Sequence, residues 1–273
     1  MKRHRPATAA YVVLGLATLF ALFPIWWIFA TSLETPARAF SFPGALFPTG
    51  TLVNYRAAFQ EAPWPRLLLN SLGIGVATTG LTLLTSVLAA YAIVFLPARL
   101  TRIAFPLVLA TLMVPFYAIL IPDYLIAKNL GWLNTYVVQV VPFAASGFAV
   151  FLLVQFMRVF PHELRDSARI DGVGEVSFLW SIVLPNLVPA LTTIGVYTFL
   201  QSWNAFLWPL IVTTSQNIQP VQVGLADFLS TANGTDWTVL SAAAAVTALP
   251  MLILYVVAQR QIVESVSRTG LRG

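Results

Sequence analysis

The chain has 273 residues, of which 58% are hydrophobic and only 9% are charged. A soluble domain usually carries about 25% charged residues, so this composition excludes a water-soluble fold and predicts an integral membrane protein. The absence of cysteine excludes disulfides and thiolate metal sites, and the two histidines, His4 and His162, lie too far apart in the sequence to suggest a histidine metal cluster.

Six uncharged intervals are each long enough for the roughly 20 helical residues that cross a bilayer core. They predict transmembrane spans, in chain order, at about residues 9–32, 68–96, 103–127, 135–157, 185–212 and 238–258. Basic residues precede the first interval, as in a signal peptide, but the apolar region of a signal peptide has only about 7–15 residues. The 27 uncharged residues of this interval therefore favour a retained membrane anchor.

The distribution of basic residues predicts the orientation of the spans. With six spans and both termini in the cytoplasm, eleven basic residues fall in cytoplasmic segments and four fall outside, which is the asymmetry that normally sets topology. The uncharged interval 176–226 is long enough for two spans, but a seventh span would move the C-terminal arginines outside and weaken the asymmetry. Membrane topology also explains the net charge of +5 better than nucleic-acid binding does. We therefore expect one all-helical membrane domain over residues 1–273.

The loop between the fourth and fifth spans, residues 158–184, is predicted to lie in the cytoplasm and to contain a helix. Its segment from Glu163 to Glu175 carries six of the 25 formal charges of the chain. Pro161 suits a first helical turn, where its missing amide needs no partner, and Glu163 then lies where the helix dipole favours an anion. Gly172 can adopt a positive φ and end this helix.

Leu164, Ser167, Ala168 and Asp171 recur at helical spacing and share one face of this predicted helix. Ser167 and Ala168 are small, so the face could fit deeply into the cleft of a partner. A second short helix is expected over about residues 174–183, with the fifth span opening directly after it. On the helical pattern alone, a docking helix and a merely solvated connecting loop are equally open interpretations.

The spacing of one motif within this loop identifies a family. The sequence Asp166-Ser-Ala is followed after three residues by Gly172 and after nine more by Ile182-x-Leu-Pro, which is the spacing of the EAA motif. That motif is typical of the membrane subunits of binding-protein-dependent ABC importers, and the chain resembles their carbohydrate-uptake branch, the maltose and glycerol-3-phosphate permease group. Asp166 and Ser167 replace the Glu and Ala of the motif, which conserves charge and size. Four further segments carry the resemblance: Leu133-Asn-Thr135, Trp203-Asn-x-Phe-Leu-Trp-Pro209, Gly234-Thr-Asp-Trp237 and Gln259-Arg260.

The resemblance implies a type I ABC importer permease with six transmembrane helices and a cytoplasmic coupling helix that docks in a groove of an ATPase. The implied partners are a second, different permease, two ATPase subunits and an extracytoplasmic solute-binding protein, at the bacterial cytoplasmic (inner) membrane. The chain has no phosphate loop G-x-x-x-x-G-K-[ST]. We therefore expect it to be no enzyme, to bind no cofactor or metal, and to leave ATP and Mg to the partner ATPases. The residues that match the coupling helix are Glu163, Leu164, Asp166, Ser167, Ala168, Asp171 and Gly172.

The function implied is ATP-driven import of a sugar or sugar-like solute, with glycerol-3-phosphate or glycerophospho-compounds as the alternative. A stand-alone secondary transporter is less well supported, because the spans hold few ionisable residues for an ion relay and no evident repeat. In the fifth span, Trp203, Trp208 and Phe206 are expected to stack on the apolar face of a sugar, while Gln201 or Asn204 hydrogen-bonds its hydroxyl groups. Hydrogen bonding between helices is an equally open role for polar groups at this depth.

Overall fold

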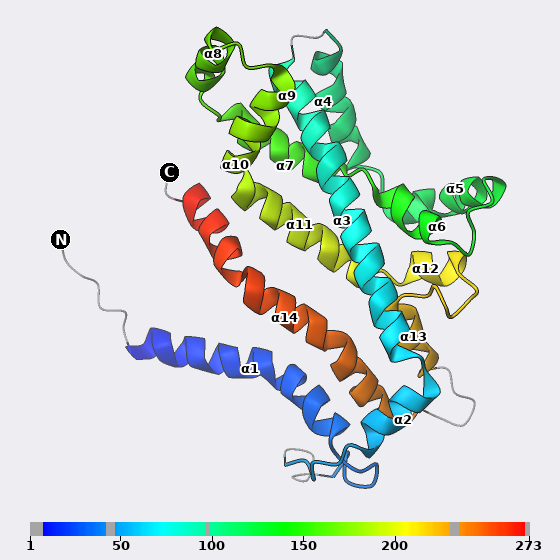
Figure 1. Cartoon of the computed structure of the whole chain (residues 1–273). Helices are drawn as coiled ribbons and strands as arrows, with labels where there is room; N and C mark the ends of the chain where they lie inside the picture. Colours follow the sequence, from blue (N-terminus) through cyan, green and yellow to red (C-terminus); the bar gives the residue numbers. More distant parts are fainter. Residues whose placement is uncertain (1–7, 42–46, 97–98, 230–234, 271–273) are drawn as a thin grey trace. The chain divides into compact units, whose positions relative to one another are not determined.

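The computed structural model describes residues 8–41, 47–96, 99–229 and 235–270, and every regular element in these ranges is a helix (Figure 1). The chain forms two compact units: unit 1 comprises residues 1–65 and 224–251, and unit 2 comprises residues 66–223 and 252–273. The helices are, in chain order, α1 (Thr8–Ser32), α2 (Val53–Glu61), α3 (Trp64–Phe95), α4 (Arg99–Thr111), α5 (Phe116–Asn129), α6 (Tyr136–Val140), η2 (Val141–Phe143), α7 (Gly147–Arg158), α8 (His162–Ile170), α9 (Glu175–Phe178), η3 (Leu179–Val183), α10 (Leu184–Asn186), α11 (Val188–Trp203), α12 (Leu207–Val212), α13 (Val221–Asp227) and α14 (Trp237–Gly270).

In unit 1, a network of buried polar groups organises the segment that follows α1. The Asn54 amide on α2 donates to the carbonyl oxygens of Ser32 and Glu34, at 2.9 and 2.7 Å, and accepts a hydrogen bond from the hydroxyl of Thr238 at 3.1 Å. The buried carboxylate of Glu34 accepts hydrogen bonds from the backbone and hydroxyl groups of Thr49. Because a buried charge is costly without such donors, these contacts fix the path of the chain after the first predicted span.

The apolar helices agree in chain order with the predicted spans. Among the described residues, four helical segments are long and apolar enough to cross a membrane, and two bent helix pairs raise the number to six if each pair is one span. The four segments cover Ala10–Ser32, Trp64–Phe95, Tyr136–Arg158 and Trp237–Val257, of which Tyr136–Arg158 contains α6, η2 and α7.

The third and fifth predicted spans are bent, which hydropathy did not predict because it measures only apolar length. The axes of α4 and α5 differ by 97°, and those of the helix over residues 175–186 and α11 differ by 80°. Pro115 precedes α5 in an extended conformation and has no amide with which to continue a helix. The second bend lies at Leu187, between Pro185 near the end of the first helix and Pro189 in the first turn of α11.

The second loop helix is longer than expected. The sequence placed it at about residues 174–183, whereas the helical conformation runs from Glu175 through a π-helical turn, η3, to Asn186. Pro185 therefore lies inside this helix rather than opening the fifth span. A proline is tolerated there because the π-helical turn before it already interrupts the regular pattern of backbone hydrogen bonds.

The fourth predicted span is interrupted between α6 and α7, and α3 compensates for the interruption. The hydroxyl of Thr82 donates to the carbonyl oxygen of Phe143 at 2.8 Å, and that of Thr85 donates to the carbonyl oxygen of Ala144 at 2.6 Å. Polar backbone groups at this depth need partners inside the protein. These two threonines provide them.

The core of unit 2 ends in an aromatic cluster beside α8. The rings of Phe95, Phe160 and Phe178 meet edge to face with centroid distances of 5.8 to 6.2 Å, a favourable arrangement for aromatic pairs. All three side chains are buried, and Ala168 of α8 belongs to the same core. In Figure 1, α8 and α9 accordingly lie beside the C-terminal end of α3.

Candidate functional site

The helix α8 ends just before Gly172, as the sequence predicted, but it begins one residue later than expected, because Pro161 lies just before its first turn rather than within it. Pro161 is its N-cap residue, Glu163 lies in its first turn, and Gly172 has a φ of +73°. The amide of Val173 donates to the carbonyl oxygen of Ala168 at 2.9 Å, and the amide of Gly172 donates to that of Arg169 at 3.1 Å. This is the Schellman motif, so the backbone at Gly172 fixes the direction in which the chain leaves α8.

The two sides of α8 differ in exposure. Ala168 is only 5% exposed because it packs into the core of unit 2. Glu163, Asp166 and Ser167 are exposed, as are the apolar side chains of Leu164 and Ile170, the latter at 87%. This side of α8 is therefore accessible to a partner.

One carboxylate joins α8 and α9 to α3. Glu175, the first residue of α9, accepts a short hydrogen bond from the phenol of Tyr91 on α3. It also forms ion pairs with Arg165 and Arg169 of α8, at 3.2 and 3.3 Å. The guanidinium group of Arg165 donates in addition to the carbonyl oxygen of Phe95, the last residue of α3, and lies 5.4 Å from the centre of its ring.

The electrostatics of this contact keep Glu175 ionised. The hydrogen bond from Tyr91 is the largest of the effects that lower the pKa of the Glu175 carboxyl below its ordinary value of 4.5. Hydrogen bonds from Arg169 and Arg165 act in the same direction, and partial burial opposes them. The side chain of Arg165 is 16% exposed, whereas that of Arg169 is 54% exposed. The pair with Arg165 is therefore the better shielded from solvent of the two ion pairs.

A pocket of about 700 Å³ lies between α3, the α6–α7 region and the end of α11. Its polar lining groups are amides and hydroxyls, and no charged side chain is among its lining residues. Gln201 donates to the phenol of Tyr197 at 2.9 Å. Such a lining suits a neutral solute with hydroxyl groups. The polar lining residues are Thr78, Thr82, Tyr117, Gln139, Ser146, Tyr197, Thr198, Gln201, Ser202, Asn204 and Trp208.

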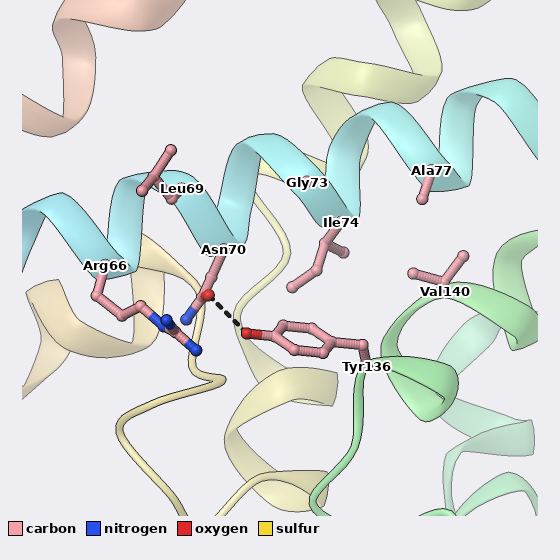
Figure 2. Close-up of a pocket in the computed structure, with 8 residues that line it drawn as sticks. All are labelled: Arg66, Leu69, Asn70, Gly73, Ile74, Ala77, Tyr136 and Val140. Atoms are coloured by element: carbon pink, nitrogen blue, oxygen red, sulfur yellow. Dashed lines mark hydrogen bonds between the residues drawn. The ribbon is translucent and has the colours of Figure 1, made fainter.

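A second pocket, of about 360 Å³, has one positively charged side chain in its lining, that of Arg66. Figure 2 shows the side chains of Arg66 and Asn70 on α3 beside that of Tyr136 on α6. The phenol of Tyr136 donates to the Asn70 carbonyl oxygen at 2.8 Å, and the Nε–H of Arg66 donates to the backbone carbonyl oxygen of Asn217 at 2.9 Å. The rest of the lining is apolar, so Arg66 gives this pocket its only formal charge.

Residues 82–268 match the protein family described as binding-protein-dependent transport system inner membrane component. The chain belongs to this family. The match includes α8 and the contact of Glu175 with Tyr91, and it confirms the resemblance predicted from the EAA spacing.

This inner membrane permease is similar to three transport permeases over nearly its whole length. It is 31% identical over 264 residues to the lactose transport system permease protein LacG of Rhizobium radiobacter, covering 97% of this chain and 96% of that protein. It is 31% identical to the sulfoquinovosyl glycerol transport system permease protein SmoH of Agrobacterium fabrum, covering 96% and 93%. It is 32% identical to the sn-glycerol-3-phosphate transport system permease protein UgpE of Yersinia pestis bv. Antiqua, covering 92% of each.

The permease also shares its fold with a solved transporter. A chain in the crystal structure of a bacterial ABC transporter involved in the import of the acidic polysaccharide alginate superposes with a TM-score of 0.84. The sequences are 24% identical, and the match covers 92% of this chain and 94% of that one. The fold is that of a type I ABC importer permease, as predicted.

The structure brings together only some of the residues predicted to line a solute path. Gln201, Asn204 and Trp208 line the larger pocket, but Trp203 does not. Trp203 is 1% exposed and stacks on Phe199 with ring centroids 6.0 Å apart. Trp208 is held by a hydrogen bond of 2.8 Å from its indole N–H to the carbonyl oxygen of Val138, so it shapes the pocket as a fixed wall.

Sequence reasoning missed the lining residues that come from other helices. Thr78 and Thr82 of α3 and Tyr197 of α11 are ordinary residues within apolar stretches, and no motif marks them. Their grouping depends on helix packing between distant segments. Within the described residues, no group of three or more His, Cys, Asp and Glu side chains is arranged to hold a metal ion.

Proposed function

We propose that this permease forms, with a second and different permease, the translocation path of an ATP-driven importer for a neutral sugar or sugar-like solute. The observation that carries the choice of solute is the larger pocket, whose lining offers amides, hydroxyls and aromatic rings but no charge. A charged solute would lose its hydration there without gaining an opposite charge. The similarity to the lactose permease LacG supports the same class of solute.

The surface of α8 is proposed to receive the movement of a cytoplasmic ATPase. The residues that would contact the ATPase are Glu163, Leu164, Asp166, Ser167 and Asp171, whose side chains are exposed. The remaining two residues of the matched motif would have other roles: the buried Ala168 anchors α8 to the core, and Gly172 sets the direction of the chain after it.

The proposal includes the arrangement of the other subunits. The loop of residues 158–184 and both termini would lie in the cytoplasm, where two ATPase subunits bind ATP and Mg. A solute-binding protein would deliver the solute on the opposite side of the bacterial inner membrane. The excess of basic residues in the segments assigned to the cytoplasm supports this orientation. A reporter fused after Gly273 is expected to behave as cytoplasmic, and an external signal would overturn the orientation.

Reconstitution tests the function directly. The permease is placed in liposomes with its partner permease, the ATPases and the binding protein, and uptake of radiolabelled lactose and other neutral saccharides is measured with and without ATP. We expect uptake only with ATP and the complete set of subunits. Uptake by the isolated chain, driven by an ion gradient, would overturn the proposal in favour of a secondary transporter.

Glycerol-3-phosphate is the second candidate solute, and one observation favours it. Arg66 places a cation in the smaller pocket (Figure 2), and guanidinium groups suit phosphate oxygens. The similarity to UgpE supports the same candidate. If the solute is a phosphate ester, Arg66→Gln should lower its uptake strongly. If the solute is neutral, the same variant should take up saccharide at close to the normal rate.

A further inference from the structure

Along the chain from α8 to the solute pocket, the regular helical conformation is interrupted twice. After α8 the chain passes through α9, the π-helical turn η3 and α10, and then bends by 80° before α11. A π-helical turn and a sharp bend are typical points of deformation in a helix. A displacement of α8 would therefore be weakened along this route before it reached Gln201 and Asn204.

A shorter connection runs through α3. Glu175 joins α8 to Tyr91, and Arg165 joins α8 to the carbonyl oxygen of Phe95. α3 is a single helix of 32 residues, and it contains no proline between Thr78 and Tyr91. Its Thr82 and Thr78 line the larger pocket. At 1.5 Å per residue, Thr82 lies about 14 Å and Thr78 about 20 Å from Tyr91 along the helix axis.

We propose that Tyr91, Glu175 and Arg165 form a transmission joint, through which movement of α8 is passed to α3 and so to the wall of the solute pocket. The three are positioning residues that touch neither solute nor nucleotide. The inference rests on the proposed function in one respect, namely that an ATPase moves α8. It adds the route that the movement takes, which is across the bundle to α3 rather than along the chain to α11.

The surrounding apolar packing keeps α8 in place when the polar contacts of the joint are removed. The apolar side chains of Ala168, Phe95, Phe160 and Phe178 pack together and hold α8 against the core, and this packing does not depend on the ion pairs. Removing the ion pairs should therefore leave α8 in place but loosen its connection to α3. A complex with a loosened joint would still bind the ATPase and hydrolyse ATP, yet each hydrolysis would move less solute.

The test measures solute transported per ATP hydrolysed in the complete reconstituted complex. We expect Glu175→Gln and Arg165→Gln to keep their membrane abundance and ATPase co-purification while this ratio falls on the order of tenfold, the factor expected when a hydrogen bond to a charged group is lost. Arg169→Gln is the matched comparison, because it removes the same charge from the same helix and one ion pair to Glu175, but none of the contacts that Arg165 makes with Phe95 of α3. Its ratio should fall less than that of Arg165→Gln.

A covalent bridge provides the converse experiment. The natural chain has no cysteine, so Tyr91→Cys with Glu175→Cys introduces the only pair of thiols. The double variant is expected to be uncoupled, and bridging the two thiols with a short bismaleimide should restore transport per ATP.

The outcomes are distinct. A normal ratio in Glu175→Gln and Arg165→Gln, or loss of abundance and of coupling together in both, would overturn the joint. Absence of ATP-driven uptake by the wild-type complex would instead overturn the proposed function, whatever the variants do.

Discussion

Gly172→Val perturbs the exit from α8 through the backbone alone. Gly172 has a φ of +73°, and a Cβ built on it meets no atom within 4 Å, so a larger side chain has room but the wrong backbone conformation. A residue other than glycine in this region costs roughly 1–3 kcal/mol. That cost corresponds to about a 5- to 150-fold shift away from the native arrangement. The Schellman hydrogen bonds of Val173 and Gly172 would be lost in the shifted state.

We expect Gly172→Val to insert normally in the membrane, to co-purify with less ATPase and to transport poorly, because α8 would leave its native direction. Membrane abundance, ATPase co-purification and ATP-driven uptake are measured on the same preparations. Gly172→Asn is the matched control, since asparagine adopts positive φ at a lower cost than a β-branched residue, and it should retain most of the activity. Normal uptake by Gly172→Val would refute the reasoning, because it would mean that the direction of α8 does not matter for transport.

Three further predictions concern packing and pH. Ala168→Trp should lower the melting temperature and the membrane abundance, because overpacking a core position that is 5% exposed costs typically 1–3 kcal/mol; an unchanged melting temperature would contradict the burial of this side chain. Gly147→Ala should also lower the melting temperature, because its Cβ would lie 2.5 Å from the hydroxyl of Thr111, and Thr111→Ala in the same chain should recover part of the loss. The carboxyl of Glu175 has a lowered pKa, so its contribution to stability is present above about pH 4.5 and is lost as the pH falls through the lowered value. The difference in melting temperature between the wild type and Glu175→Gln should therefore be present at pH 7 and shrink below pH 4.5, and a difference that is constant with pH would argue against an ionised Glu175.

The sequence predicted the features of the fold that depend on apolar length and local backbone chemistry. Uncharged intervals indicated where long apolar helices form, and the positive φ of Gly172 followed from its place after a short helix. The bends near Pro115 and Leu187 were not predicted, because they lie inside uncharged intervals. The extra length of the α9–α10 helix was missed because Pro185 was expected to begin a helix, whereas it lies within one.

The candidate site could be predicted from the sequence only in part, because it depends on contacts between distant segments. Glu175 was visible in the sequence only as one charge in a charged loop, and its partner Tyr91 is 84 residues away within an apolar helix. The sequence placed Ala168 on a face expected to fit into the cleft of a partner, whereas its side chain packs into the core of unit 2, because helical spacing cannot say which side of α8 faces the core. The role of these residues in coupling stays a prediction that the variants above address.

The two threonine hydroxyls that cap the interruption between α6 and α7 have a consequence for biogenesis. Because Phe143 and Ala144 obtain their hydrogen-bond partners from α3, the fourth span alone would expose unpaired carbonyl oxygens to hydrocarbon, at a cost of several kcal/mol for each group. We expect this span to enter the lipid efficiently only after α3 is present, which the order of synthesis ensures. In a glycosylation-mapping assay with the isolated span of residues 135–158, insertion should improve when α3 is supplied on the same chain. Thr82→Val with Thr85→Val should remove that improvement, and equal insertion with and without the hydroxyls would show that the span needs no such help.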